Sequence, residues 1–197
     1  MEIKRALESR IENWQLLKHP FYQAWEGGTL PQEALQAYAK EYGAFIANLP
    51  QGWQTLNDAE TAHEEVEHAE LWNQFAQTLD TAVSAPELPA VQRLVERSQQ
   101  YFSAAPTAMG AMFAFEVQQP ETASSKLQGL RDHFELPEAA ETYFIEHTNN
   151  QHEAEKLLAL MQGLSAEDMD KALDACEGMS QALWEALTDI YDTYCVQ

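Results

Sequence analysis

The stretch DAETAHEEVEHAELWNQF spans residues 58–75 and has the spacing of an amphipathic helix. Leu71, Trp72 and Phe75 recur at the three- and four-residue intervals that place side chains on one helix face. His68 lies three and four residues before Leu71 and Trp72, so it shares the face that we expect to be buried. The stretch therefore predicts a helix that carries an ionisable side chain toward the protein core.

The same helical pattern continues along the chain, and no segment shows the period-two alternation of a β-strand. Helix-start signals recur, as at Pro31 and Ser165. Pro120 should produce a kink or an irregular turn just after Glu116. We expect an all-α fold in which residues 1–197 form a single compact seven-helix bundle. The expected helices are residues 2–18, 32–48, 51–80, 89–103, 106–134, 137–162 and 166–194.

The chain is strongly acidic, with 11 basic and 32 acidic residues and a formal net charge of −21. Such a polyanion repels nucleic acid and anionic membranes, so we expect neither as a partner. The chain has no long apolar run that could span a membrane, and its start lacks the apolar core of a secretory signal, which predicts a cytoplasmic protein. Composition alone leaves open whether the carboxylates form a solvated surface or face a cation.

A second segment, MGAMFAFE at residues 109–116, reaches Glu116 after seven uncharged residues. A carboxylate in apolar surroundings is costly without a partner. A bound cation, a buried Lys or Arg, or a shifted pKa would each satisfy it. We expect Glu116 to be buried and to be a candidate metal ligand.

A third segment places His147 after an aromatic run, with His152 and Glu155 as the next candidate ligands. His147 and His152 are five residues apart, about 140° around a regular helix. Both can face one site only where the helix is locally widened, as in a π-bulge.

The helix at 58–75 offers further carboxylates near His68. Glu65 forms a Glu-x-x-His pair with it, the form used in di-iron sites of helix bundles. Glu64 lies one turn before His68, and Glu60 lies eight residues before it. With Glu116 and His147, the three segments supply two imidazoles and a carboxylate from separate helices, which is the ligand set of non-haem Fe(II) oxygen chemistry.

Several short motifs occur in a fixed order over nearly the whole chain: His19-Pro-Phe-Tyr22-x-x-Trp25, the helix from Tyr38 to Pro50, His68-x-x-Leu-Trp72-x-x-Phe75, Phe115-Glu116-x-Gln-x-Pro120-Glu121, Gly129-Leu130 and Tyr143-Phe144-x-x-His147. Together they resemble the haem-oxygenase-like di-iron oxidase superfamily, which is related in fold to the PqqC and TenA proteins. The branch they resemble most is that of the CADD-like proteins. The resemblance implies a haem-oxygenase-like helical fold.

In that superfamily the metal ligands follow Glu-x6-His on one helix, a single Glu on the next, and His-x3-Asp/Glu-x2-His on the third. His68, Glu116 and His147 match these positions. The remaining donors are each displaced by one residue, and they are Glu60, His152 and Glu155. Local bulges would restore a site for two metals, whereas regular helices would leave a site for one metal or none. The implied cofactor is iron, as one or two ions, with manganese as an alternative.

CADD-like proteins are associated with the formation of para-aminobenzoate, a folate precursor, at the cost of a tyrosine of their own chain. Tyr22 matches the sacrificed tyrosine, and Lys126 matches a lysine implicated as the amino donor. Tyr42 lies where another redox tyrosine is found, whereas Phe115 replaces a tyrosine that often precedes the central Glu. Each of these residues could equally be an ordinary packing or surface residue.

Two functional hypotheses follow. In the first, an oxidase or oxygenase activates O2 at the His/Glu site and oxidises a small molecule or an internal tyrosine such as Tyr22. In the second, the chain is a metal-free or degenerate PqqC/TenA-like small-molecule enzyme or binding protein. The oligomeric state stays open, with a homodimer as one candidate.

Overall fold

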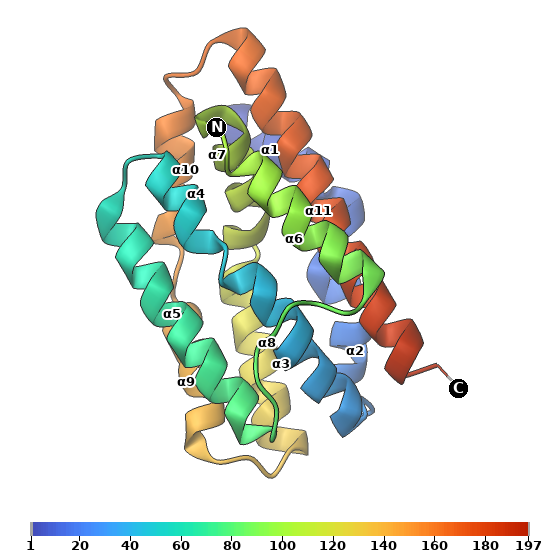
Figure 1. The fold of residues 1–197 in the computed structure, drawn as a ribbon. Coiled ribbons are helices and arrows are strands. Elements are labelled where there is room, and N and C mark those ends of the chain that lie inside the picture. Colours follow the sequence, from blue (N-terminus) through green and yellow to red (C-terminus); the bar gives the residue numbers. More distant parts are fainter. Residues whose placement is uncertain (1, 197) are drawn as a thin grey trace.

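The computed structural model describes residues 2–196, and every regular element within them is helical (Figure 1). The α-helices are α1 (Glu2–Ile11), α2 (Pro20–Glu26), α3 (Gln32–Ile46), α4 (Leu49–Thr55), α5 (Ala59–Thr78), α6 (Pro89–Tyr101), α7 (Ala105–Glu116), α8 (Gln119–His133), α9 (Thr142–His147), α10 (His152–Met161) and α11 (Ala166–Tyr194). Short 3-10 turns occupy Glu12–Trp14, Leu16–Lys18 and Glu138–Ala140. The all-α prediction is confirmed, although the described residues form more and shorter helices than the seven expected.

Local capping explains where two of the longest helices begin. The Asp58 side chain accepts a hydrogen bond from the backbone N–H of Thr61 at 3.1 Å and caps α5. Ser165 caps α11 in the same way, accepting from the N–H of Asp168 at 3.1 Å. Each cap satisfies a backbone donor that has no partner inside the helix. The predicted helix at 166–194 therefore begins where its cap dictates.

Two predicted helices, 2–18 and 51–80, are interrupted. Within 2–18, α1 ends at Ile11 and two 3-10 turns follow, separated by Gln15, whose backbone is extended with a ψ of 114°. Asn57 has a φ of 61°, in the left-handed region that asparagine tolerates, and this turn separates α4 from α5. The predicted helix at 106–134 is also divided, because α7 ends at Glu116 and α8 begins at Gln119. This is the irregular turn expected near Pro120.

The interruption that matters most for the site separates α9 from α10 at residues 148–151. The Thr148 hydroxyl donates to the carbonyl of Ile145 at 2.9 Å, and the Asn150 amide donates to the Glu153 carboxylate. Side-chain bonds of this kind compete with helical hydrogen bonds. A full break therefore stands where the sequence predicted one continuous helix over 137–162, for which a widened turn was one alternative.

The helix α7 lies at the centre of the core, and all of its residues from Ala108 to Glu116 are buried. It packs chiefly against α11, which runs the length of the molecule beside α6 (Figure 1). Gly110 approaches the backbone carbonyl of Ala172 so closely that a Cβ there would collide with it. Although α7 is apolar as far as Glu116, neither it nor any other described helix is long and apolar enough to cross a membrane.

Replacing Gly110 with alanine should destabilise the protein by about 3 kcal/mol, because the new methyl group must push α7 away from the α11 backbone. Gly163→Ala is the control, since the nearest atom to its added Cβ is 3.7 Å away. Urea denaturation of both variants measures the difference. Equal stabilities would show that the α7–α11 contact does not require glycine.

Candidate metal centre

Five ionisable side chains from four helices meet inside the bundle. The helix α5 supplies Glu65 and His68, α7 and α9 end at Glu116 and His147, and α10 supplies Glu153. Ligand atoms of Glu65, His68 and Glu153 all lie within 4.8 Å of one another. The rings of His68 and His147 have centroids 4.4 Å apart, and Glu116 contacts the Glu153 carboxyl. These five residues are called the carboxylate–histidine cluster below.

The cluster is almost sealed from water. Glu65, Glu116 and Glu153 are each 1% exposed, and His147 is 2% exposed. Burial, followed by the charges of Glu153 and Glu65, raises the pKa of Glu116 well above its usual 4.5. Burial and the charge of Glu65 raise the pKa of Glu153 to about 7. Without a cation, these carboxyls are therefore held partly in the protonated form.

Each of the three carboxylates has one oxygen without a hydrogen-bond partner among residues 2–196: Glu65 Oε2, Glu116 Oε1 and Glu153 Oε1. Across the same residues, the ion pairs of Glu65 and Glu153 are to histidines, and Glu116 has none. Buried carboxylates are stable when they are paired or bind a metal. Imidazole nitrogens and carboxylate oxygens suit iron or manganese, so the residues present fit such an ion.

Hydrogen bonding prepares His147 to be a ligand. Its Nδ1 lies 2.6 Å from the carbonyl oxygen of Tyr143, which can only accept, so Nδ1 carries the proton and Nε2 keeps a free lone pair. Burial, together with the neighbouring His68, lowers the pKa of His147 to about 3. The imidazole is thus neutral, with the orientation and protonation typical of a metal-binding histidine.

The predicted ligands divide into two sets. Of the three matched residues, His68 belongs to a group of metal-capable side chains, His147 lies ring to ring against it, and Glu116 adjoins Glu153 of the same group. Glu60 and Glu155 are exposed and belong to neither group of metal-capable side chains found in residues 2–196. The one-residue bulges that would have brought them inward are absent from α5 and α10 as the structure describes them.

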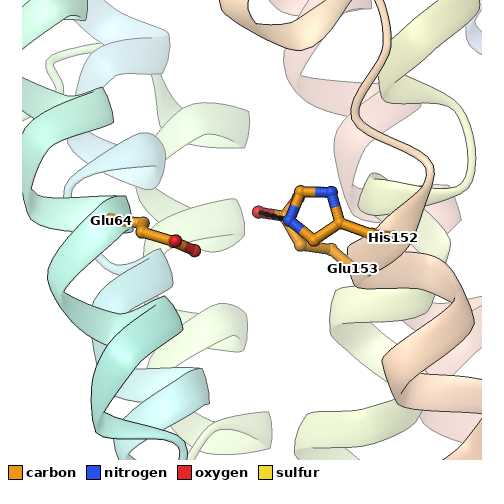
Figure 2. Close-up of side chains that lie close together, drawn as sticks. All are labelled: Glu64, His152 and Glu153. Carbon is orange, nitrogen blue, oxygen red and sulfur yellow. Dashed lines mark ion pairs between the residues drawn. The ribbon is translucent and has the colours of Figure 1, made fainter.

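Glu64 and His152 form an outer group with Glu153, whose ligand atoms also lie within 4.8 Å of one another. Figure 2 shows Glu64 on α5 pointing across toward His152 and Glu153 on α10. The His152 side chain is 58% exposed, whereas Glu153 is buried and belongs to both groups. Glu153 is therefore the donor that connects the buried cluster to the surface.

Sequence reasoning missed Glu153 and noted Glu65 only as the partner of His68 in a Glu-x-x-His pair. Glu153 is six residues after His147, which is off the face of one continuous helix. The break at 148–151 resets the register and turns Glu153 inward. The signal that could have revealed it is the Thr148-Asn149-Asn150 run, since such residues favour turns over helix interiors.

A second buried group lies on α2, α3 and α8. The hydroxyls of Tyr22 and Tyr38 are 3.0 Å apart, and the Lys126 Nζ donates to Tyr38 at 3.4 Å. Nζ also lies 5.4 Å from the centre of the Tyr22 ring. The predicted Tyr22 and Lys126 thus come together, and Tyr38, which the sequence did not single out, contacts both. The predicted Tyr42 stacks on Tyr38 at 4.9 Å, and its hydroxyl has no partner among residues 2–196.

Aromatic rings connect this group to the carboxylate–histidine cluster. Trp72 packs against Tyr38 with centroids 5.3 Å apart and against Tyr143 at 4.8 Å. Tyr143 in turn stacks on His147 at 4.1 Å. The two groups therefore form one continuous buried site.

Comparison with known proteins shows the family of this chain. A family model described as an iron-containing redox enzyme matches residues 36–185, which include all five residues of the cluster. The chain belongs to this family. It is therefore an enzyme of the oxidoreductase kind. A further model, of the TENA/THI-4/PQQC family, matches residues 8–53.

The relatives match most of the length of this chain. A 4-aminobenzoate synthase of Chlamydia pneumoniae is 28% identical, over 95% of this chain and 94% of that protein. One from Chlamydia muridarum is 30% identical, over 93% and 88%. A solved structure from Shewanella denitrificans, described as having a heme oxygenase-like fold, matches with a TM-score of 0.79 at 16% identity and covers 98% of this chain and 92% of that one. The predicted haem-oxygenase-like fold is confirmed.

Glu153→Gln should stabilise the metal-free enzyme at alkaline pH. Because the folded-state pKa of Glu153 is raised from 4.5 to about 7, its favourable contribution is present below the unfolded pKa and is lost as pH rises through about 7. We expect the variant to exceed the parent by about 2 kcal/mol near pH 8 and by little near pH 5. Urea denaturation with a chelator present measures this, and Glu155→Gln, exposed on the same helix, is the control. A difference that does not depend on pH would contradict the expectation.

Proposed function

We propose that this enzyme is an iron-dependent oxidase that uses O2 and a tyrosine of its own chain, Tyr22, to form 4-aminobenzoate. The three buried carboxylates with unpartnered oxygens, beside two imidazoles, are the observation that carries the metal site. The name shared by the relatives supports the product. The resemblance of Tyr22 to a sacrificed tyrosine supports the internal substrate.

Glu65, His68, Glu116, His147 and Glu153 are the residues that would hold iron. Bound iron would supply the redox chemistry needed for a reaction with O2. The protein supplies a dry pocket, a neutral His147 fixed by the Tyr143 carbonyl, and negative charge that favours a cation. Glu64 and His152 offer a second position that shares Glu153, so the site has donors for one ion or two. Manganese suits the same donors.

Lys126 has the properties of a nitrogen donor. It is 3% exposed, and burial lowers the pKa of its amine to about 7, so a large fraction is neutral near neutral pH. Only the neutral amine has the lone pair needed to form a new bond to carbon. Tyr38 accepts a hydrogen bond from this amine and also contacts the Tyr22 hydroxyl, which holds the two groups beside each other.

The aromatic rings of Tyr38, Trp72 and Tyr143 support an internal rather than an external substrate. Their ring contacts extend without interruption from Tyr22 to His147, so packed side chains of this protein connect the buried tyrosine to the cluster. Tyr22 is 2% exposed and is already part of the buried site, so this substrate does not have to diffuse in from solvent.

The metal-free alternative has less support. Its expected sign is an ion pair between Glu116 and a lysine or arginine, which would satisfy the buried charge. The ion pairs formed by residues 2–196 do not include one, and Glu116 Oε1 stays without a partner.

Iron content tests the metal site directly. The parent, reconstituted anaerobically with ferrous iron and freed of excess, should retain one or two ions per chain by elemental analysis. His68→Ala and Glu116→Ala each remove a donor. Each should weaken the affinity for iron at least tenfold, or by about 1.4 kcal/mol or more, so that less iron is retained. Glu60→Ala, which alters an exposed residue, should retain as much iron as the parent. No bound iron in the parent would overturn the proposal.

Tyr22→Phe tests the internal substrate. The variant keeps the ring in the core but loses the hydroxyl that bonds Tyr38, so it should bind iron normally and form no 4-aminobenzoate. In the parent, mass spectrometry after exposure to O2 should find a mass loss confined to the Tyr22 peptide. Tyr194→Phe, at the exposed end of α11, should behave as the parent. Product formed by Tyr22→Phe at the parent's level would identify an external substrate instead.

A further inference from the structure

A cleft of about 280 Å³ opens between α1, α7, α8 and α10 and reaches the cluster at Glu116. Its lining is Lys4, Glu8, Phe113, Glu116, Val117, Pro120, Glu121, Gln151, Ala154, Glu155 and Leu158. A larger neighbouring cleft of about 570 Å³ shares Glu8, Val117 and Glu121 but contains no residue of the cluster. Of these two clefts, the smaller is therefore the one that reaches a residue of the cluster, on the side away from His152 on α10.

The inner end of this cleft is a carboxylate with one oxygen that lacks a partner. Glu116 is 1% exposed, and its Oε1 makes no hydrogen bond with any atom of residues 2–196. Because Glu116 both lines the cleft and contacts Glu153, a ligand that reaches it has reached the cluster. A positively charged ligand would satisfy this oxygen.

The outer end is acidic. Glu8 on α1, Glu121 on α8 and Glu155 on α10 are all exposed lining residues. Lys4 is the single basic residue of the lining, and it lies 3.8 Å from Glu8, in an ion pair whose side chains are 55% and 51% exposed. Three carboxylates against one ammonium leave the mouth with a net negative charge, and the exposed Lys4–Glu8 pair is weak.

We propose that this cleft is the route by which a divalent cation reaches the buried cluster, with Glu8, Glu121 and Glu155 attracting the ion and Glu116 receiving it. The inference rests on the proposed metal site and adds how that site is filled. Clefts lined by charge of one sign focus the electrostatic field and raise the rate at which an oppositely charged ligand enters. An anionic organic molecule would be repelled here, and O2 has no charge for the carboxylates to attract.

Stopped-flow absorption after anaerobic mixing with Co²⁺ tests the route, because the visible bands of bound Co²⁺ report loading without any turnover. In the triple variant Glu8→Gln, Glu121→Gln and Glu155→Gln, the association rate constant should fall about fivefold or more at low salt, and its salt dependence should weaken. Lys4→Gln should raise the rate. The Co²⁺ bound at saturation should stay at the parent's level in both variants, since none of these residues belongs to the cluster.

The matched control removes the same charge elsewhere, with Glu33→Gln, Glu96→Gln and Glu138→Gln, all of them exposed residues outside the cleft. Both triple variants change the formal net charge from −21 to −18 (−21 + 3). Equal slowing in the two would overturn the route and leave only a general charge effect. A parent that binds no Co²⁺ and no Fe²⁺ would overturn the metal site itself, whereas normal binding with an unchanged rate would overturn the route alone.

Discussion

Glu65, Glu116 and Glu153 repel one another in a volume from which water is nearly excluded, and this constraint shapes the rest of the site. Three like charges so close together are tolerated only with protons or with a cation. The raised pKa values of Glu116 and Glu153 report the first solution, and the unpartnered oxygens point toward the second. Under the proposed function, the protein gives up stability in its metal-free form to hold an arrangement that a metal ion would complete.

The parts of the fold that the sequence predicts well are those governed by local chemistry. The helix at 166–194 begins at the Ser165 cap, and the turn after Glu116 follows from Pro120. Glu116 was expected to be buried because seven uncharged residues precede it. His68 shares a face with Trp72 at ordinary helical spacing. Such features depend on residues within one or two turns, which a single sequence displays.

Tertiary effects account for what the sequence did not predict. Glu153 faces the cluster only because α9 stops and α10 starts in a new register, held in part by the bond from Asn150 to Glu153 itself. Tyr38 acquires its place between Tyr22 and Lys126 from the packing of α2, α3 and α8. The helical periodicity of a single segment encodes neither arrangement. Glu153 is separated from His147 by a helix break, and Tyr38 lies on a different helix from Tyr22 and from Lys126.

Under the proposed function, the burial of Tyr22 has a consequence for the stability of the chain after it has reacted. Its ring packs against Phe21, Trp25 and Tyr38 in the core. A reaction that removes this side chain leaves a void of the kind made by truncating a core aromatic residue, at a cost of about 3–5 kcal/mol. That is a large fraction of the roughly 5–15 kcal/mol that holds an ordinary domain folded. A spent chain would consequently unfold far more often than a fresh one, so its turnover by cellular proteases would follow from the same chemistry that forms the product.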